Sequence, residues 1–199
     1  MAAAITPRRR VQAALTWLIA AGLGPVHAHA GEMPPPAYQI AAQQAGVPSP
    51  VLFAVALQES GIRLRGRLIP WPWTLNVADR SERYATRGEA CIGIHRALAS
   101  VPASRIDVGL AQINLGYQAN RYAAPCDLLD PYANLAIAAQ ILREQHAAGE
   151  DWLLAIGRYH RPAGGAPAVR YRRSVSRHLA RVLADSRLPA WPADARDTP

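Results

Sequence analysis

The chain has 199 residues and a formal net charge of +8, from 22 basic residues, all of them arginine, against 14 Asp and Glu residues. Its two cysteines form no CxxC pattern, and no HExxH, dinucleotide-binding or P-loop glycine pattern occurs. The sequence therefore gives no indication of a metal site, a cofactor or nucleotide chemistry.

The N-terminal 30 residues have the pattern of a secretory signal peptide. Three arginines at positions 8–10 precede an apolar stretch over residues 11–23, and Ala28-His29-Ala30 is a small-x-small cleavage pattern. The apolar stretch is short for a membrane span. We therefore expect that the signal peptide is cleaved and that the mature protein is periplasmic or otherwise exported. An uncleaved N-terminal anchor is the alternative. No second apolar span follows, so no membrane span is expected after cleavage.

The remaining 169 residues suit one domain with a hydrophobic core. Three arginines and no acid lie in residues 1–30, so removing them lowers the net charge from +8 to +5. A positive surface on an exported protein fits an acidic polymer, such as cell-wall glycan that bears peptide carboxylates. Nucleic acid is not expected as a partner, because no basic helix is interleaved with aromatic residues and no zinc-finger spacing occurs.

The two cysteines, Cys91 and Cys126, lie in the part expected to be exported, where thiols become oxidised. A disulfide between them is the simplest interpretation. Closing a loop of that length contributes on the order of 3–4 kcal/mol to stability. Two buried free thiols are the alternative, because unpaired cysteine is often buried.

In chain order, residues 31–36 are a Pro-rich leader and 37–45 a short helix that Gly46 ends. Ser49 and Pro50 start a second helix, with the Ser49 hydroxyl as its cap, and Gly61 ends it. Residues 71–77 favour a strand that returns after a turn at 78–80, which predicts a small hairpin.

Further on, Thr86 and Glu89 form a capping box that opens a helix through about Ala99. Residues 101–122 are loop-rich. Helices are then predicted from Asp130 to Gly149, from Asp151 through Tyr159 and from 168 to 183, followed by a flexible tail over 184–199. The predicted fold class is α+β, predominantly α, with a small β-hairpin.

Glu59 is the candidate catalytic residue. It lies in the last turn of an apolar helix in which almost nothing else can ionise. Apolar neighbours and the negative end of the helix dipole both disfavour its charged form, so its pKa is expected to rise. A carboxyl of that kind can protonate a glycosidic oxygen near neutral pH. The alternative is a partly exposed Glu paired with a nearby arginine.

Four segments together resemble the soluble lytic transglycosylases, bacterial enzymes with a lysozyme-like domain that cut peptidoglycan. They are Glu59-Ser60, Gly109-Leu110-Ala111-Gln112-Ile113-Asn114, the helix from Asn134 to Glu144, and Ala155-Ile156-Gly157-Arg158-Tyr159-His160. The resemblance covers about residues 37–183. The insert around residues 71–77 is similar to members carried by conjugative elements and secretion systems.

The resemblance implies a role for each matching position. Glu59 would be the single acid and base, and no cofactor or metal would be needed. Ser60, Gln112, Asn114 and Tyr159 would form the substrate-binding part, with Ser60 supporting the catalytic turn. This chain departs from the family at His160, where asparagine is usual, and at Ala111, where methionine is common.

The reaction implied is cleavage of the bond between N-acetylmuramic acid and N-acetylglucosamine without water, which leaves a 1,6-anhydro end. A lysozyme-type hydrolase is the alternative if Asp107 faces Glu59 across a water-sized gap, whereas a loop Asp that turns the backbone before Gly109 is the simpler interpretation. A glycan-binding or secretion-scaffold module without catalysis is a further alternative. Trp71 and Trp73 either stack on sugars or pack against the core, and Glu82 and Glu89 have structural roles.

Overall fold

The structure is a computed structural model that describes residues 33–184. The signal peptide predicted over residues 1–30 and all but the first residue of the predicted tail lie outside this range. Ala184, the first residue of that tail, is the last residue of a helix. The leader prediction is wrong at its end, because Pro34 is buried and a helix begins at Pro36.

Six α-helices form most of the described chain, and all six were expected from the sequence. They are α1 (Pro36–Ala45), α2 (Ser49–Ser60), α3 (Arg87–Leu98), α4 (Pro131–Glu144), α5 (Trp152–His160) and α6 (Gly165–Ala184). Three short 3-10 helices, η1 (Ala103–Arg105), η2 (Ala119–Arg121) and η3 (Pro125–Leu129), lie in the connections. The fold class is α+β and predominantly α, as predicted.

Helix starts and ends follow the sequence with three exceptions, of which the first is that α6 begins at Gly165 rather than at 168. The capping box of Thr86 and Glu89 is present at α3. The Ser49 prediction is wrong, because Pro48 occupies the cap position of α2 and no side chain caps that helix. Helix α4 ends at Glu144 rather than near Gly149, since residues 145–149 offer no buried apolar side chain to continue its inner face.

Six short strands form two antiparallel sheets. The predicted hairpin is present as β3 (Thr74–Val77) and β4 (Arg80–Arg83), joined at Ala78 and Asp79, which both have positive φ as a type I′ turn requires. Three features were missed: the hairpin of β1 (Gly61–Leu64) and β2 (Arg67–Pro70), the strand β5 (Ile106–Val108), and β6 (Ile113–Asn114). The larger sheet has the order β4-β3-β5-β6.

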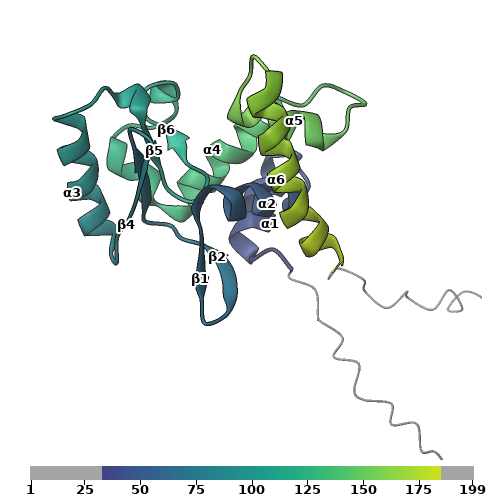
Figure 1. The fold of residues 1–199 in the computed structure, drawn as a ribbon, viewed down its shortest axis with the longest axis horizontal. Helices are drawn as coiled ribbons and strands as arrows, with labels where there is room; N and C mark the ends of the chain where they lie inside the picture. Colours follow the sequence, from purple (N-terminus) through teal and green to yellow (C-terminus); the bar gives the residue numbers. More distant parts are fainter. Residues whose placement is uncertain (1–32, 185–199) are drawn as a thin grey trace, which may run out of the picture.

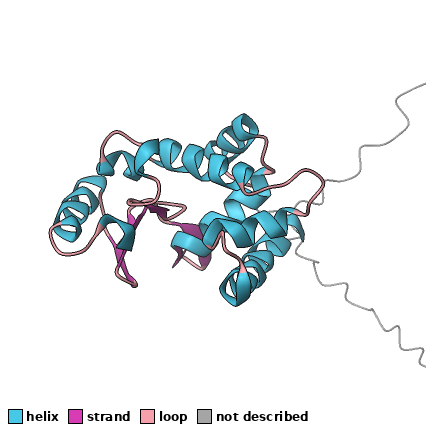
Figure 2. Ribbon diagram, turned by 90° about the horizontal axis from the view of Figure 1, so that it is seen from above, coloured by secondary structure: helices cyan, strands magenta, loops and turns pink. Residues whose placement is uncertain are grey.

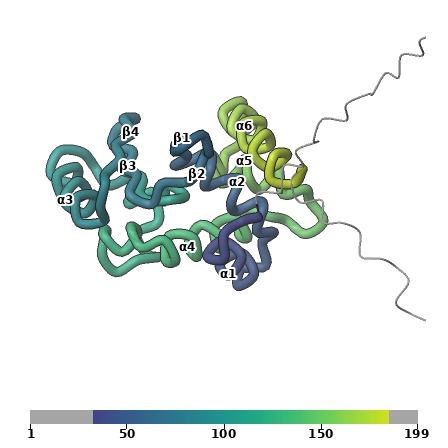
Figure 3. The backbone as a smooth tube through the Cα atoms, turned by 90° about the horizontal axis from the view of Figure 1, so that it is seen from below, coloured from purple at the N-terminus to yellow at the C-terminus, as the bar shows by residue number. Residues whose placement is uncertain are grey.

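Figure 1 places α3 and the four-stranded sheet at one end of the molecule and α1, α2, α5 and α6 at the other, with α4 between them. The tube in Figure 3 shows the same division from another side, with the β1–β2 hairpin next to α2. Figure 2 shows that the strands occupy a small part of a mainly helical structure.

Helix α2 is the centre of the core. Its residues 51–57 are all buried, including Leu52, Ala54 and Val55 with no exposed surface. A helix that is apolar on every side must be surrounded by other elements, and α2 packs against α1, α4, α6 and β2. Its last turn, which carries Glu59, therefore has a position fixed by the surrounding core.

Gly61 allows the chain to turn abruptly from α2 into β1. A Cβ atom built at this position would lie 2.2 Å from the carbonyl oxygen of Leu57. No other residue type fits there without a backbone shift, so the helix ends directly after Glu59 and Ser60.

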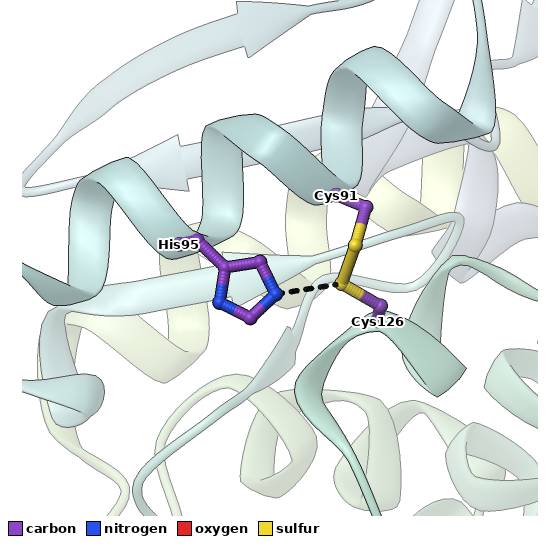
Figure 4. Close-up of side chains that lie close together, drawn as sticks. All are labelled: Cys91, His95 and Cys126. Carbon is purple, nitrogen blue, oxygen red and sulfur yellow. Dashed lines mark hydrogen bonds between the residues drawn. A yellow bond between two sulfur atoms is a disulfide. The ribbon is translucent and has the colours of Figure 1, made fainter.

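The predicted disulfide is confirmed: Cys91 on α3 and Cys126 on η3 are bonded, with Cα atoms 5.3 Å apart (Figure 4). The His95 ring, one turn along α3, has its Nε2 atom 3.6 Å from the Cys126 sulfur. The potential ligand atoms of Cys91, His95 and Cys126 lie within 4.8 Å of one another. Because the two sulfurs are bonded to each other, neither is a thiolate ligand for a metal ion.

Within residues 33–184 no single helix is both long and apolar enough to cross a membrane. Helices α1 and α2 pass that test only when taken together, and they meet at a bend of 119°.

Candidate active site

A cavity of about 480 Å³ lies between the sheet and the helical end of the molecule. Its walls bring together side chains from α2, β3, β4, β5, β6, α4 and α5. They are Glu59, Asn76, Ser81, Asp107, Gln112, Ile113, Asn114, Tyr117, Gln118, Ile141, Tyr159, His160 and Pro162. Four of the five predicted catalytic and substrate-binding residues, Glu59, Gln112, Asn114 and Tyr159, are in this list.

The Glu59 carboxyl enters the cavity from the end of α2 and is only partly accessible. Its pKa is raised to about 7, mainly by burial and to a smaller extent by the negative charge of Asp107. A hydrogen bond from the Tyr171 hydroxyl acts in the opposite direction, because it stabilises the carboxylate. Arginine pairing, the alternative weighed for Glu59, does not occur in the described structure, so the carboxyl can hold a proton near neutral pH.

Tyr171 on α6 is a site residue that the sequence analysis missed. It is buried, its hydroxyl donates to Oε1 of Glu59, and its ring is stacked on His160 with centroids 4.5 Å apart and planes 4° apart. It lies 112 residues from Glu59 in the chain. The only sequence signal was a Tyr on the inward face of an otherwise arginine-rich helix.

Asn134 on α4 holds the segment 109–114 against the core. It is 1% exposed, its amide group donates to the carbonyls of Val108 and Leu128 at 2.9 Å each, and its Oδ1 accepts from the Ala111 N–H at 2.9 Å. Gly109 allows this approach: it has φ +84°, and a Cβ there would lie 2.3 Å from Nδ2 of Asn134. These three hydrogen bonds of Asn134 fix the segment 109–114 to α4, and we call them the Asn134 clamp.

Gln112 lies in the cavity wall with a positive φ of 49°. Its side-chain amide donates to the carbonyls of Thr74 and Gly109, at 3.1 Å and 2.9 Å. Both side-chain amide hydrogens of Gln112 are therefore used in hydrogen bonds to the backbone. The side-chain carbonyl oxygen has no bonded partner among the described residues and can accept a hydrogen bond from a ligand.

Asp107 and Asn114 face each other across β5 and β6. The Asn114 amide donates to Oδ1 of Asp107 at 2.8 Å, and Asn76 donates to Oδ2 at 3.0 Å. The interpretation of Asp107 as a loop residue that only turns the backbone is wrong, since it is a strand residue whose side chain lines the cavity. Burial raises its pKa, and the two amide hydrogen bonds oppose that rise.

Asn114 is more fully occupied than a free substrate-binding amide would be. Its amide group also reaches the Ser104 carbonyl at 3.0 Å, and its Oδ1 accepts from the N–H groups of Gly116 and Tyr117 at 3.0 Å. All its polar atoms have protein partners. Its main effect on the site is to fix Asp107 and the loop that leads to Tyr117.

Ser60 and Tyr159 also hold the 109–114 segment, through hydrogen bonds to its backbone carbonyls. The Ser60 hydroxyl donates to the Leu110 carbonyl at 2.7 Å, and the Tyr159 hydroxyl donates to the Ala111 carbonyl at 2.7 Å. Ser60 is fully buried and does not line the cavity, so its placement among the substrate-binding residues is corrected to a positioning role. Tyr159 has both roles, because its ring also lines the cavity.

Trp71 and Trp73 do not line the cavity. Their rings meet edge to face at 5.6 Å, and the Trp71 indole N–H donates to the Tyr84 carbonyl at 2.8 Å. Trp73 packs against the core. The packing interpretation therefore fits both residues better than sugar stacking. Glu82 and Glu89 also have the structural contacts expected of them, to Tyr84 and to the start of α3.

Comparisons of the chain with protein-family models, with curated proteins and with solved structures gave no match. The chemical interpretation of the cavity therefore rests on its own residues. It contains one carboxyl poised to exchange a proton, a second carboxyl fixed by two amides, and an unpaired amide carbonyl. This set can protonate and deprotonate oxygen atoms of a bound polyhydroxyl ligand.

We predict that Asn134→Asp destabilises the protein by at least about 3 kcal/mol at neutral pH, because a buried carboxylate cannot donate to the carbonyls of Val108 and Leu128. The measurement is the free energy of unfolding in urea. The matched control is Asn120→Asp, the same change at an exposed position in η2, which we expect to stay within about 0.5 kcal/mol. Equal effects of the two substitutions would contradict the role of Asn134 in holding the segment 109–114.

We also predict a pH-dependent gain in stability for Glu59→Gln. The pKa of Glu59 is raised from 4.5 to about 7 on folding, so the folded protein holds this proton more tightly than the unfolded chain. The stability that this proton confers is lost as pH rises from about 4.5 to about 7, and the variant does not lose it. The difference should reach about 2–3 kcal/mol at pH 8 relative to pH 4.

Urea unfolding of the wild type and of Glu59→Gln across this pH range measures the difference. Glu144→Gln, the same substitution at a 51% exposed side chain of α4 that pairs with Arg121 at the surface, is the control, and we expect its effect to stay within about 1 kcal/mol. A difference between wild type and Glu59→Gln that does not change with pH would mean that Glu59 titrates as an ordinary glutamate.

Proposed function

We propose that the protein is a peptidoglycan lytic transglycosylase that cleaves the bond between N-acetylmuramic acid and N-acetylglucosamine. The observation that carries this proposal is the Glu59 carboxyl in a cavity next to the 109–114 segment, with a pKa raised to about 7 by burial. The resemblance of four sequence segments to soluble lytic transglycosylases supports the same activity.

In the proposed reaction Glu59 gives its proton to the glycosidic oxygen as the bond from that oxygen to C1 breaks. The N-acetylglucosamine side leaves with a free hydroxyl, and the substrate's acetamido group stabilises the oxocarbenium-like C1. The C6 hydroxyl then bonds to C1 and returns its proton to the Glu59 carboxylate. No water is consumed, and Glu59 ends the cycle protonated. A pKa near neutrality suits a group that is first acid and then base.

Other cavity residues fit a sugar polymer. The free carbonyl oxygen of Gln112 can accept from an acetamido N–H or a sugar hydroxyl. Tyr117, which is 76% exposed and lines the cavity, offers an aromatic face on which a sugar ring can stack. His160 stands beside Tyr171 at the same wall, where the resembling family usually has asparagine.

A hydrolytic muramidase is the second candidate, and the position of Asp107 favours it. Hydrolytic glycosidases pair an acid with a second carboxylate that activates water or attacks C1. Asp107 lines the same cavity as Glu59 and acts electrostatically on it. The two amide hydrogen bonds that hold Asp107 also satisfy both of its oxygens, which weakens it as a base or nucleophile. We therefore retain the transglycosylase as the first choice.

The setting proposed for this activity is the periplasm or another exported location, reached through the signal sequence of residues 1–30. The partner is then the glycan strand of the cell wall. A conjugation or secretion apparatus that needs a local opening in the wall is the proposed context.

Digestion of purified sacculi, with mass spectrometry of the released fragments, tests the proposal. We expect 1,6-anhydro ends from the wild type and a rate lower by about 10²–10⁴ for Glu59→Gln, since removing general acid catalysis has an effect of that size. Ser81→Ala, which changes another residue of the cavity wall, is the control for changes in cavity shape.

The fragments also separate the alternatives. Reducing ends that incorporate solvent oxygen would show hydrolysis and would support the muramidase instead of the transglycosylase. Asp107→Asn should then abolish the release of fragments. Sacculi that bind the protein but release nothing would overturn the enzyme and favour a binding module. Undiminished release by Glu59→Gln would remove Glu59 from the chemistry.

A further inference from the structure

The positive charge of the described chain is concentrated in one segment. Residues 33–157 contain ten arginines and ten Asp or Glu residues, so they are neutral overall. Residues 158–184 contain seven arginines and no acidic residue. The whole net charge of the described chain is therefore carried by the end of α5, the following loop and α6.

Within this segment, three arginines form a row on the outer face of α6. Arg170, Arg173 and Arg177 follow helical spacing of three and four residues and are all exposed. The inward face of the helix is marked by Tyr171, Val175 and Val182, which are buried. The row spans about 10 Å along the helix axis. We call these three residues the α6 arginine row.

No carboxylate neutralises this row in the described structure. The ion pairs between described residues are those of Arg105 with Asp79, Arg121 with Glu144 and Arg158 with Glu150, and none of them involves the row. Arg177 contacts the Ser174 hydroxyl on its own helix at 3.2 Å. The three guanidinium groups of the row are thus available to an external anion.

We infer that the α6 arginine row is a docking surface for a membrane that contains anionic lipids. A helix face is convex and offers no groove for a polymer chain, but a planar array of phosphates can meet several arginines of one row together. The residues beside the row, Ala166, Ala180 and Ala184, are exposed, and their small side chains do not cover the arginines. The apolar face of α6 is buried in the core, so the contact is purely electrostatic, between guanidinium groups and lipid phosphates.

Nucleic acid is the competing polyanion, and two observations disfavour it. Single-stranded binding surfaces combine basic side chains with aromatic rings on which bases stack, and the outer face of α6 has no aromatic residue. The remainder of the described chain is neutral overall, so it adds no net positive charge to extend the contact along a polymer.

Docking through this row would leave the cavity accessible. None of the three arginines lines the cavity, and α6 contributes Tyr171 to the Glu59 site from its opposite face.

The start of α1 and the end of α6 lie on the same side of the molecule (Figures 1 and 3). The inference does not depend on the proposed enzymatic activity, because it concerns a different surface.

Vesicle co-sedimentation tests the inference. The protein is purified after export, and its binding to vesicles of phosphatidylcholine alone is compared with binding to vesicles that also contain phosphatidylglycerol. We expect binding only to the anionic vesicles, and loss of that binding at about 1 M salt, where the Debye length is about 3 Å. Each arginine near an anionic surface is worth roughly a fivefold change in partitioning.

The decisive variant is the triple substitution Arg170→Gln, Arg173→Gln and Arg177→Gln, which should weaken binding on the order of a hundredfold. Its matched control is Arg63→Gln, Arg65→Gln and Arg67→Gln on the β1–β2 hairpin, where three exposed arginines are lost with the same change in net charge. All variants share one N-terminus, so any contribution from that segment is equal. Circular dichroism confirms that both triple variants are folded.

Three results would overturn the inference. Equal weakening by both triple variants would mean that only net charge matters. Undiminished binding by the α6 variant would place the contact elsewhere. Preferential binding of single-stranded DNA over anionic vesicles, lost in the α6 variant, would assign the row to nucleic acid instead.

Discussion

The burial of one carboxyl at the end of α2 is the constraint on which the site depends. Water can solvate the Glu59 carboxylate only partly, and its main protein partner is the hydroxyl of Tyr171. The charged form is therefore costly, and the pKa rises to about 7. The protein tolerates this cost because α2 is enclosed on every side by other helices and strands, so the carboxyl cannot move into bulk solvent without disturbing the core.

The opposite wall of the cavity is held by a different kind of interaction. The segment from Gly109 to Asn114 has little regular structure, and its carbonyl and N–H groups are bonded instead by side chains of Ser60, Asn134 and Tyr159. These three residues come from α2, α4 and α5. Buried polar side chains thus hold a loop as a rigid wall of the cavity that contains Glu59, which is what the proposed acid and base role requires.

The helices were predictable from the sequence because their signals are local. Examples are the capping box of Thr86 and Glu89, and the apolar spacing around Leu135 in α4. Glu59 was identifiable for the same reason, as an ionisable residue isolated in an apolar helix. The roles of Tyr171 and Asn134 were not predictable, since each depends on contacts with residues far away in the chain. Asp107 was misjudged because β5 is only three residues long and has a weak strand signal.

The most direct test of this account is the titration of Glu59 itself. In a protein labelled with ¹³C at glutamate side chains, the carboxyl signal that disappears in Glu59→Gln belongs to Glu59 and can be followed by NMR as pH changes. We expect its midpoint near pH 7, with the other glutamates as internal references in the same spectra. A midpoint near 4.3, the value of an unperturbed glutamate, would contradict the proposed acid and base role.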